Sequence, residues 1–171
     1  MTPEQATFVR DLVLPVLQRE YKTTQTVLAA VPANNPEYRP DPNAKTAFEL
    51  AWHIASAENL FLDAVSAGQF NFGGSRPESI RTLADIAPWY GERMAEHVKR
   101  IGAMSGEDLA RTVDFRGFMQ LPAVQYIEFS LRHISHHRGQ LSTYLRPMGG
   151  KVPAIYGESY DSAQARKAAQ S

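Results

Sequence analysis

Three of the five histidines in this chain, His133, His136 and His137, lie within five residues of one another. In a helix of about 3.6 residues per turn, His133 and His137 stack on one face while His136 turns to the outer side. Two imidazoles at this spacing can reach a single metal ion, as in helical zinc sites. Because two ligands alone bind a metal weakly, a third must come from elsewhere in the chain.

His53 is the candidate for the third ligand. In a helix over residues 46–67 it lies in the middle of the apolar face, near Ala57 and Leu60. An unpaired polar ring on that face would be costly. If this helix packs against the segment that carries His133 and His137, the three rings supply neutral nitrogen ligands and leave a coordination position open. The alternative is that they are ordinary hydrogen-bonded core residues.

Other residues are weaker candidates for the site. His97 stands among charged residues and is expected to be a solvated helix residue. Glu49 lies one turn before His53, and Gln140 lies one turn after His137, so either could orient a ligand ring. A solvated position is equally open to both. The sequence identifies no catalytic or substrate-binding residue, because no carboxylate is placed clearly enough to be a general base.

The composition excludes several classes of protein. The 171 residues include no cysteine, which rules out disulfides, thiolate ligands, iron–sulfur clusters and a cysteine nucleophile. The 18 basic and 18 acidic residues cancel, so no charge excess favours nucleic acid or an anionic membrane as a partner. With no leader or membrane-spanning pattern, we expect a cytoplasmic protein.

The elements that must position the histidines are four long amphipathic helices. The ends of these helices are marked by Thr residues that can cap them and by Pro and Gly residues. The connection over residues 32–45 is rich in Pro and Asn, and the sequence shows no strand pattern. The expected helices run from about Thr2 to Val31, Thr46 to Ala67, Thr82 to Met104 and Leu121 to Arg146. The fold class is therefore all-α, a four-helix bundle, with one domain over residues 1–160 and a loose tail over 161–171.

Shorter features fit the same architecture. Residues 105–108 predict one short helical turn, and residues 115–118 an irregular stretch. Glu58 is placed at the edge of an apolar helix face. The aromatic residues follow helical spacing and are interpreted as core rather than as a base-stacking surface; they include Trp52, Phe61, Trp89, Tyr90, Tyr126 and Phe129. Phosphate loops, serine elbows and acidic calcium loops are missing from the sequence.

The segment His133–Leu141, followed by Tyr144–Arg146, resembles the closing motif of the DinB/YfiT-like superfamily of small metal-binding bundles. Val152–Gly157 is also similar to that family. Trp52–Ile54, with Glu58 after it, resembles the place where the family supplies its first ligand. The resemblance covers essentially the whole chain. It implies a bundle of up-down-down-up type, often a homodimer, that binds one divalent ion through His53, His133 and His137.

Members of this superfamily include transferases and isomerases that use low-molecular-weight thiols such as mycothiol or bacillithiol. The resemblance and the histidines together favour a metal-dependent thiol transferase acting on a small molecule, with zinc or nickel as the ion and iron as a further candidate. Its sulfur would arrive with a cosubstrate, because the chain has no cysteine. Alternatives are a metal-dependent hydrolase, a non-catalytic stress protein that binds metal or a small ligand, and an interaction module.

Overall fold

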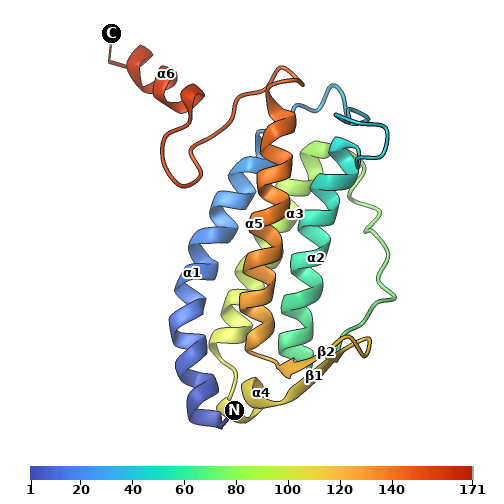
Figure 1. Cartoon of the computed structure of the whole chain (residues 1–171), viewed down its shortest axis with the longest axis vertical. Helices are drawn as coiled ribbons and strands as arrows, with labels where there is room; N and C mark the ends of the chain where they lie inside the picture. The colour runs from blue at the N-terminus through green and yellow to red at the C-terminus, as the bar shows by residue number, and fades with distance from the viewer. Residues whose placement is uncertain (171) are drawn as a thin grey trace.

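The structure is a computed structural model that describes residues 1–170. Within that range, four long helices form the bundle, and a short helix, a two-stranded hairpin and a C-terminal helix complete the chain (Figure 1). In chain order the elements are α1 (Pro3–Ala29), α2 (Ala47–Ala67), α3 (Leu83–Gly102), α4 (Gly106–Ala110), β1 (Thr112–Phe115), β2 (Met119–Pro122), α5 (Gln125–Leu145) and α6 (Tyr160–Ala168). No helix in residues 1–170 is long and apolar enough to cross a membrane.

The bundle has the up-down-down-up topology. In Figure 1, α1 and α5 run upward and α2 and α3 run downward. Around the bundle, α1 packs against α3, α3 against α2, α2 against α5, and α5 against α1. Because α2 and α3 run in the same direction, residues 68–82 must return along the length of the bundle, and Figure 1 shows this connection beside α2. The predicted four-helix bundle is confirmed.

Local capping explains why the helices begin where the sequence predicts. The Thr2 and Thr46 hydroxyls accept from the backbone N–H groups of Gln5 (3.3 Å) and Glu49 (3.1 Å), and each of these side chains accepts from its Thr backbone in return. At the other end of α2, Gly68 adopts φ +74°, a left-handed conformation that favours glycine. These caps fix the beginnings of α1 and α2 and the end of α2, and the start of α2 is further held because its first two N–H groups donate to the carbonyls of Tyr38 and Pro36.

The hairpin corrects the prediction that the chain has no strands. β1 and β2 pair antiparallel, with Thr112 opposite Pro122, and the Tyr126 hydroxyl of α5 donates to the carbonyls of Val113 (3.0 Å) and Met119 (3.2 Å). Because Leu121 belongs to β2, α5 begins at Gln125, later than predicted. Four-residue strands are too short to show a clear alternation in sequence. The predicted short turn after Ser105 corresponds to α4.

The C-terminal segment differs from the loose tail that the sequence predicts. Residues 160–168 form the helix α6, which starts with a Ser159 cap on the backbone N–H of Ser162 at 3.0 Å. None of its residues is buried, and it extends away from the bundle in Figure 1. The helix is therefore held by its cap and by Asp161, which pairs with Arg146 at 2.9 Å and accepts from the Val152 N–H, rather than by burial. Residue 171 of the predicted tail lies outside the described residues.

The bundle core contains a buried carboxyl group. The sequence places Glu58 at the edge of an apolar face, but the side chain is fully buried and accepts a hydrogen bond from the Tyr90 hydroxyl of α3. Its other oxygen, Oε1, has no hydrogen-bond partner among residues 1–170. Burial raises the pKa of Glu58 to about 7. The prediction that aromatic residues at helical spacing form part of the core holds for Phe61, Tyr90 and Tyr126, which are buried.

We predict that Glu58→Gln changes how the free energy of unfolding depends on pH. Because the folded-state pKa of Glu58 lies above its unfolded value, the stability contributed by the protonated carboxyl is full below about pH 4.5 and is lost as the pH rises through about 7. The variant lacks this loss. Its stability relative to wild type should therefore rise by about 2–3 kcal/mol from pH 5 to pH 8.

The measurement is urea unfolding of both proteins with chelator present. The free energy of unfolding of wild type is subtracted from that of the variant at each pH. This removes the contribution of the histidines, which is the same in both proteins and which, because their pKa values are lowered, changes stability in the opposite direction over this range. Glu92→Gln, at an exposed position of α3, is the matched control and should show no such trend. A difference that stays flat for Glu58→Gln would contradict the prediction.

Candidate metal centre

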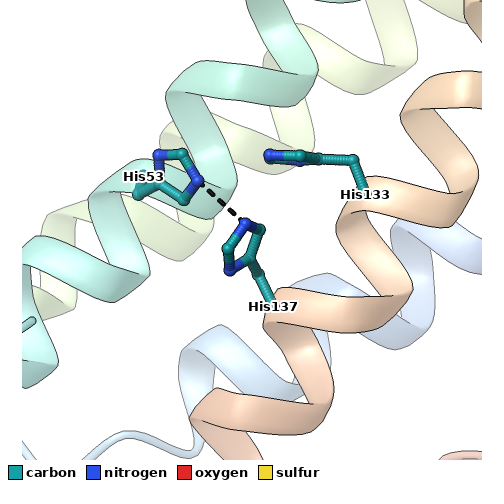
Figure 2. Close-up of side chains that lie close together, drawn as sticks. All are labelled: His53, His133 and His137. Carbon is teal, nitrogen blue, oxygen red and sulfur yellow. Dashed lines mark hydrogen bonds between the residues drawn. The ribbon is translucent and has the colours of Figure 1, made fainter. Parts of the chain in front are cut away.

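The three predicted histidines lie together between α2 and α5. Figure 2 shows His53 pointing from α2 toward His133 and His137 on α5. One ring nitrogen from each residue lies within 4.8 Å of the others. The Nε2 atoms of His53 and His137 are 3.1 Å apart, and the centroids of the His133 and His137 rings are separated by 4.4 Å. All three side chains are half-buried.

This cluster could hold a metal ion. Zinc–nitrogen bonds of about 2.0–2.1 Å in tetrahedral geometry place two ligand nitrogens roughly 3.3 Å apart. The 3.1 Å separation of the His53 and His137 Nε2 atoms is close to that distance. In residues 1–170 the cluster consists of these three histidines, with no carboxylate among them. The donor set is therefore three imidazoles.

The surroundings keep the imidazoles neutral, as metal ligands must be. Burial, with the added repulsion of His137, lowers the pKa of His53 to about 4, and burial together with the neighbouring histidines does the same for His133. The pKa of His137 is also lowered, mainly by burial. At pH 7 each ring therefore keeps a lone pair on one nitrogen.

Hydrogen bonds settle which nitrogen of His137 is free. Its Nδ1 donates to Gln140 Oε1 at 2.7 Å, so the lone pair is on Nε2, which accepts from the Nε2–H of His53 at 3.1 Å (Figure 2). His133 Nδ1 is buried without a hydrogen-bond partner among residues 1–170. The suggestion that Gln140 orients a ligand ring is thus supported. Glu49 instead caps α2, because its carboxylate accepts from the Thr46 N–H at 2.8 Å.

The remaining two histidines lie outside the cluster. His136 is exposed, as predicted, although its ring centroid is 4.8 Å from that of His137. His97 corrects the prediction, since it is only 2 % exposed and its Nε2 bonds with Asn59 Oδ1 at 2.9 Å. Burial lowers its pKa to about 4. The signal for this burial was its helical spacing from the apolar residues Met94 and Ile101.

Arg138 is a positioning residue that sequence reasoning missed. Its side chain is 1 % exposed, and its guanidinium pairs with the Glu20 carboxylate of α1 at 2.7 Å and donates to the Thr24 hydroxyl at 3.1 Å. The available signal was its register, because Arg138 is four residues after the buried Ile134 and three before the buried Leu141. It therefore fastens α5 to α1 directly beside the histidine cluster.

The comparison with protein families agrees with this geometry. The model of the DinB family matches residues 5–169. The chain belongs to the DinB family. Two relatives in Bacillus subtilis strain 168 are named as uncharacterized proteins. YjoA is 25% identical over 115 residues, 66% of this chain and 73% of YjoA, and YrdA is 26% identical over 113 residues, 63% of this chain and 64% of YrdA.

Solved structures of DinB-like proteins share the fold. The crystal structure of YjoA from Bacillus subtilis superposes with a TM-score of 0.71 at 21% identity, covering 86% of this chain and 99% of that one. A DinB-like protein from Bacillus cereus ATCC 10987 gives a TM-score of 0.69 at 24% identity, with 84% and 95% covered. At these identities the likeness establishes the fold of this DinB family protein and leaves its chemistry to the site.

We predict that Gln140→Ala weakens zinc binding by about tenfold to a hundredfold, because the variant no longer fixes the orientation and tautomer of His137. A zinc titration against a competing chelator measures the affinity. His136→Ala is the matched control, since it removes a neighbouring exposed group of α5 and should leave the affinity unchanged. Wild-type affinity in Gln140→Ala would contradict the role given to the amide.

Proposed function

We propose that this DinB family protein is a metal-dependent enzyme of the thiol-transferase type, with one divalent transition-metal ion held by His53, His133 and His137. The observation that carries the proposal is that ring nitrogens of three half-buried histidines lie within 4.8 Å of one another, with lowered pKa values that keep the rings neutral. Imidazole ligands suit zinc, nickel and iron. Zinc and nickel are the first candidates and iron is a further one.

The number of ligands supports a catalytic rather than a purely structural ion. A structural zinc site takes four protein ligands, whereas a catalytic site takes three and leaves a position for substrate or water. The two nearby residues that could have completed a closed site do not join the cluster. Glu49 caps α2, and His136 points to solvent. A purely structural role for the ion therefore has no fourth ligand to support it among residues 1–170.

A divalent ion with neutral ligands supplies Lewis acidity that lowers the pKa of a thiol or water beside it. The chain itself has no cysteine, so the sulfur must enter with a low-molecular-weight cosubstrate. In the overall transfer a sulfur–carbon bond forms, the bond from that carbon to its leaving group breaks, the leaving group departs with the bonding electrons, and the thiol proton passes to solvent. Gln140 keeps His137 in its ligand tautomer throughout.

The first test is the metal content of untagged protein purified without chelator. Elemental mass spectrometry should find about one ion per chain in wild type. His53→Ala, His133→Ala and His137→Ala should each lose the ion, because two imidazoles hold a metal weakly. His136→Ala is the control and should retain it. Folded wild type that takes up no zinc, nickel or iron would overturn the proposal.

The second test is turnover by the metal-loaded protein. Mycothiol, bacillithiol and other small thiols are incubated with an alkylating electrophile, and the thioether product is followed by mass spectrometry. We expect product to form faster with wild type than with His53→Ala or His137→Ala. Thiol-independent hydrolysis of an ester would instead favour a metal-dependent hydrolase, and a bound ion with neither activity would favour a non-catalytic metal-binding protein.

A further inference from the structure

A cleft of about 760 Å³ adjoins the histidine cluster and shares His53 with it. Its walls come from the solvent side of α2, from α3 and from the connection over residues 68–82, with Arg116 of the hairpin turn at its margin. His53 is thus a wall residue of this cleft as well as a member of the cluster. The cleft therefore borders the proposed metal site at His53, whereas His133 and His137 are not among its lining residues.

The charged residues of the cleft leave two positive groups uncompensated. Three arginines and one aspartate line it. Asp63 pairs with Arg100 at 3.2 Å, and Arg93 pairs with Glu96 at 3.1 Å. Arg76 and Arg116 have no carboxylate within ion-pair distance in the part of the chain that the structure describes. The cleft therefore presents two unpaired guanidinium groups.

Aromatic rings hold both of these guanidinium groups. Arg116 Cζ lies 3.9 Å from the centroid of the Phe72 ring, and Arg76 Cζ lies 4.9 Å from that of Phe48. A guanidinium stacked on a ring keeps its N–H edges free, and those edges match a carboxylate or phosphate group. Because stacking restricts the long side chains, less conformational entropy is lost when an anion binds.

The backbone at Arg116 provides an independent indication. Arg116 has φ +54°, and the structure has no other non-glycine residue with positive φ in residues 1–170. It is followed by Gly117 at φ +74° in the turn that joins β1 and β2. Such turns favour Asn-Gly, and holding a bulkier residue in this conformation costs on the order of 1 kcal/mol. Strain of this kind concentrates where a side chain must be aimed at a ligand.

The cleft also offers an apolar wall. Trp52 of α2 and Trp89 of α3 line it together, with ring centroids 5.1 Å apart. Both side chains are half-buried, so each keeps part of its ring surface in contact with solvent. The combination of an aromatic wall and free guanidinium groups fits a ligand with an apolar body and an anionic end.

We propose that this cleft is the substrate subsite of the proposed enzyme and that it selects a small molecule bearing a carboxylate or phosphate group, bound by Arg76 beside Phe48 in the first turn of α2 or by Arg116 beside Phe72 beyond the end of α2. The assignment rests on the proposed function for its link to catalysis. Anion binding itself depends on the arginines and not on a metal ion, so the two proposals can fail separately.

The chain carries its own reporter of this binding. Trp52 and Trp89 are its two tryptophans, and both line the cleft. Intrinsic fluorescence is followed while hexanoate, inorganic phosphate or uncharged hexanamide is added at constant ionic strength, with calorimetry in parallel. Chelator-treated protein is used first and zinc-loaded protein second. Hexanoate or phosphate should bind saturably in both, and hexanamide at least about tenfold more weakly than hexanoate, because it has no charge for the arginines.

The deciding variant is Arg76→Gln with Arg116→Asn, in which Asn suits the left-handed turn and preserves the fold. It should weaken binding of the anion by about tenfold or more while hexanamide binding stays unchanged. Arg19→Gln, an exposed position on α1 outside the cleft, is the matched control and should bind as wild type does.

Three results would overturn the proposal. They are equal binding of hexanoate and hexanamide without saturable phosphate binding, full anion affinity in the double variant, and no saturable anion binding by either method. One form of the second result is anion binding that occurs only in zinc-loaded protein and is unchanged in the double variant; it would place the anion on the metal instead of on the arginines. A protein that binds hexanoate through Arg76 or Arg116 but takes up no metal would support the cleft and reject the metal-dependent enzyme.

Discussion

One constraint on the histidine cluster is the ion pair between Arg138 and α1. Arg138 is buried and pairs with Glu20 at 2.7 Å. Adjacent residues of a helix point about 100° apart, so fastening Arg138 to α1 turns its neighbour His137, with His133 one turn earlier, toward α2. Breaking a buried pair of this kind costs about 3–5 kcal/mol, although the intact pair adds little net stability. We infer that its main contribution is the rotation of α5.

The bundle separates two kinds of polar group. Glu58 and His97 lie in the interior, where hydrogen bonds to Tyr90 and Asn59 offset part of their desolvation. The three clustered histidines are instead half-buried between α2 and α5. Glu58 Oε1 and His97 Nδ1 nevertheless have no hydrogen-bond partner among residues 1–170, and the same is true of His133 Nδ1 in the cluster. The second group is suited to an external ligand, because one ring nitrogen from each of its residues lies within 4.8 Å of the others.

The long connection between α2 and α3 gives the site its second component. Since these two helices run in the same direction, residues 68–82 must pass along the outside of α2, and they build one wall of the cleft beside His53. The topology that places α2 beside α5 for the histidine cluster therefore also creates the cleft. In a simple up-and-down bundle a short turn would replace this connection and the wall would be missing.

The sequence by itself determined what depends on neighbouring residues. Thr caps and Gly68 set helix ends, and the spacing of His133 and His137 stacked them on one face. Only the tertiary structure decided the burial of Glu58 and His97, the hairpin, the path of residues 68–82 and the meeting of His53 with His137, 84 residues away. Capping and periodicity act within one or two turns, whereas burial and contact depend on which distant segments pack together.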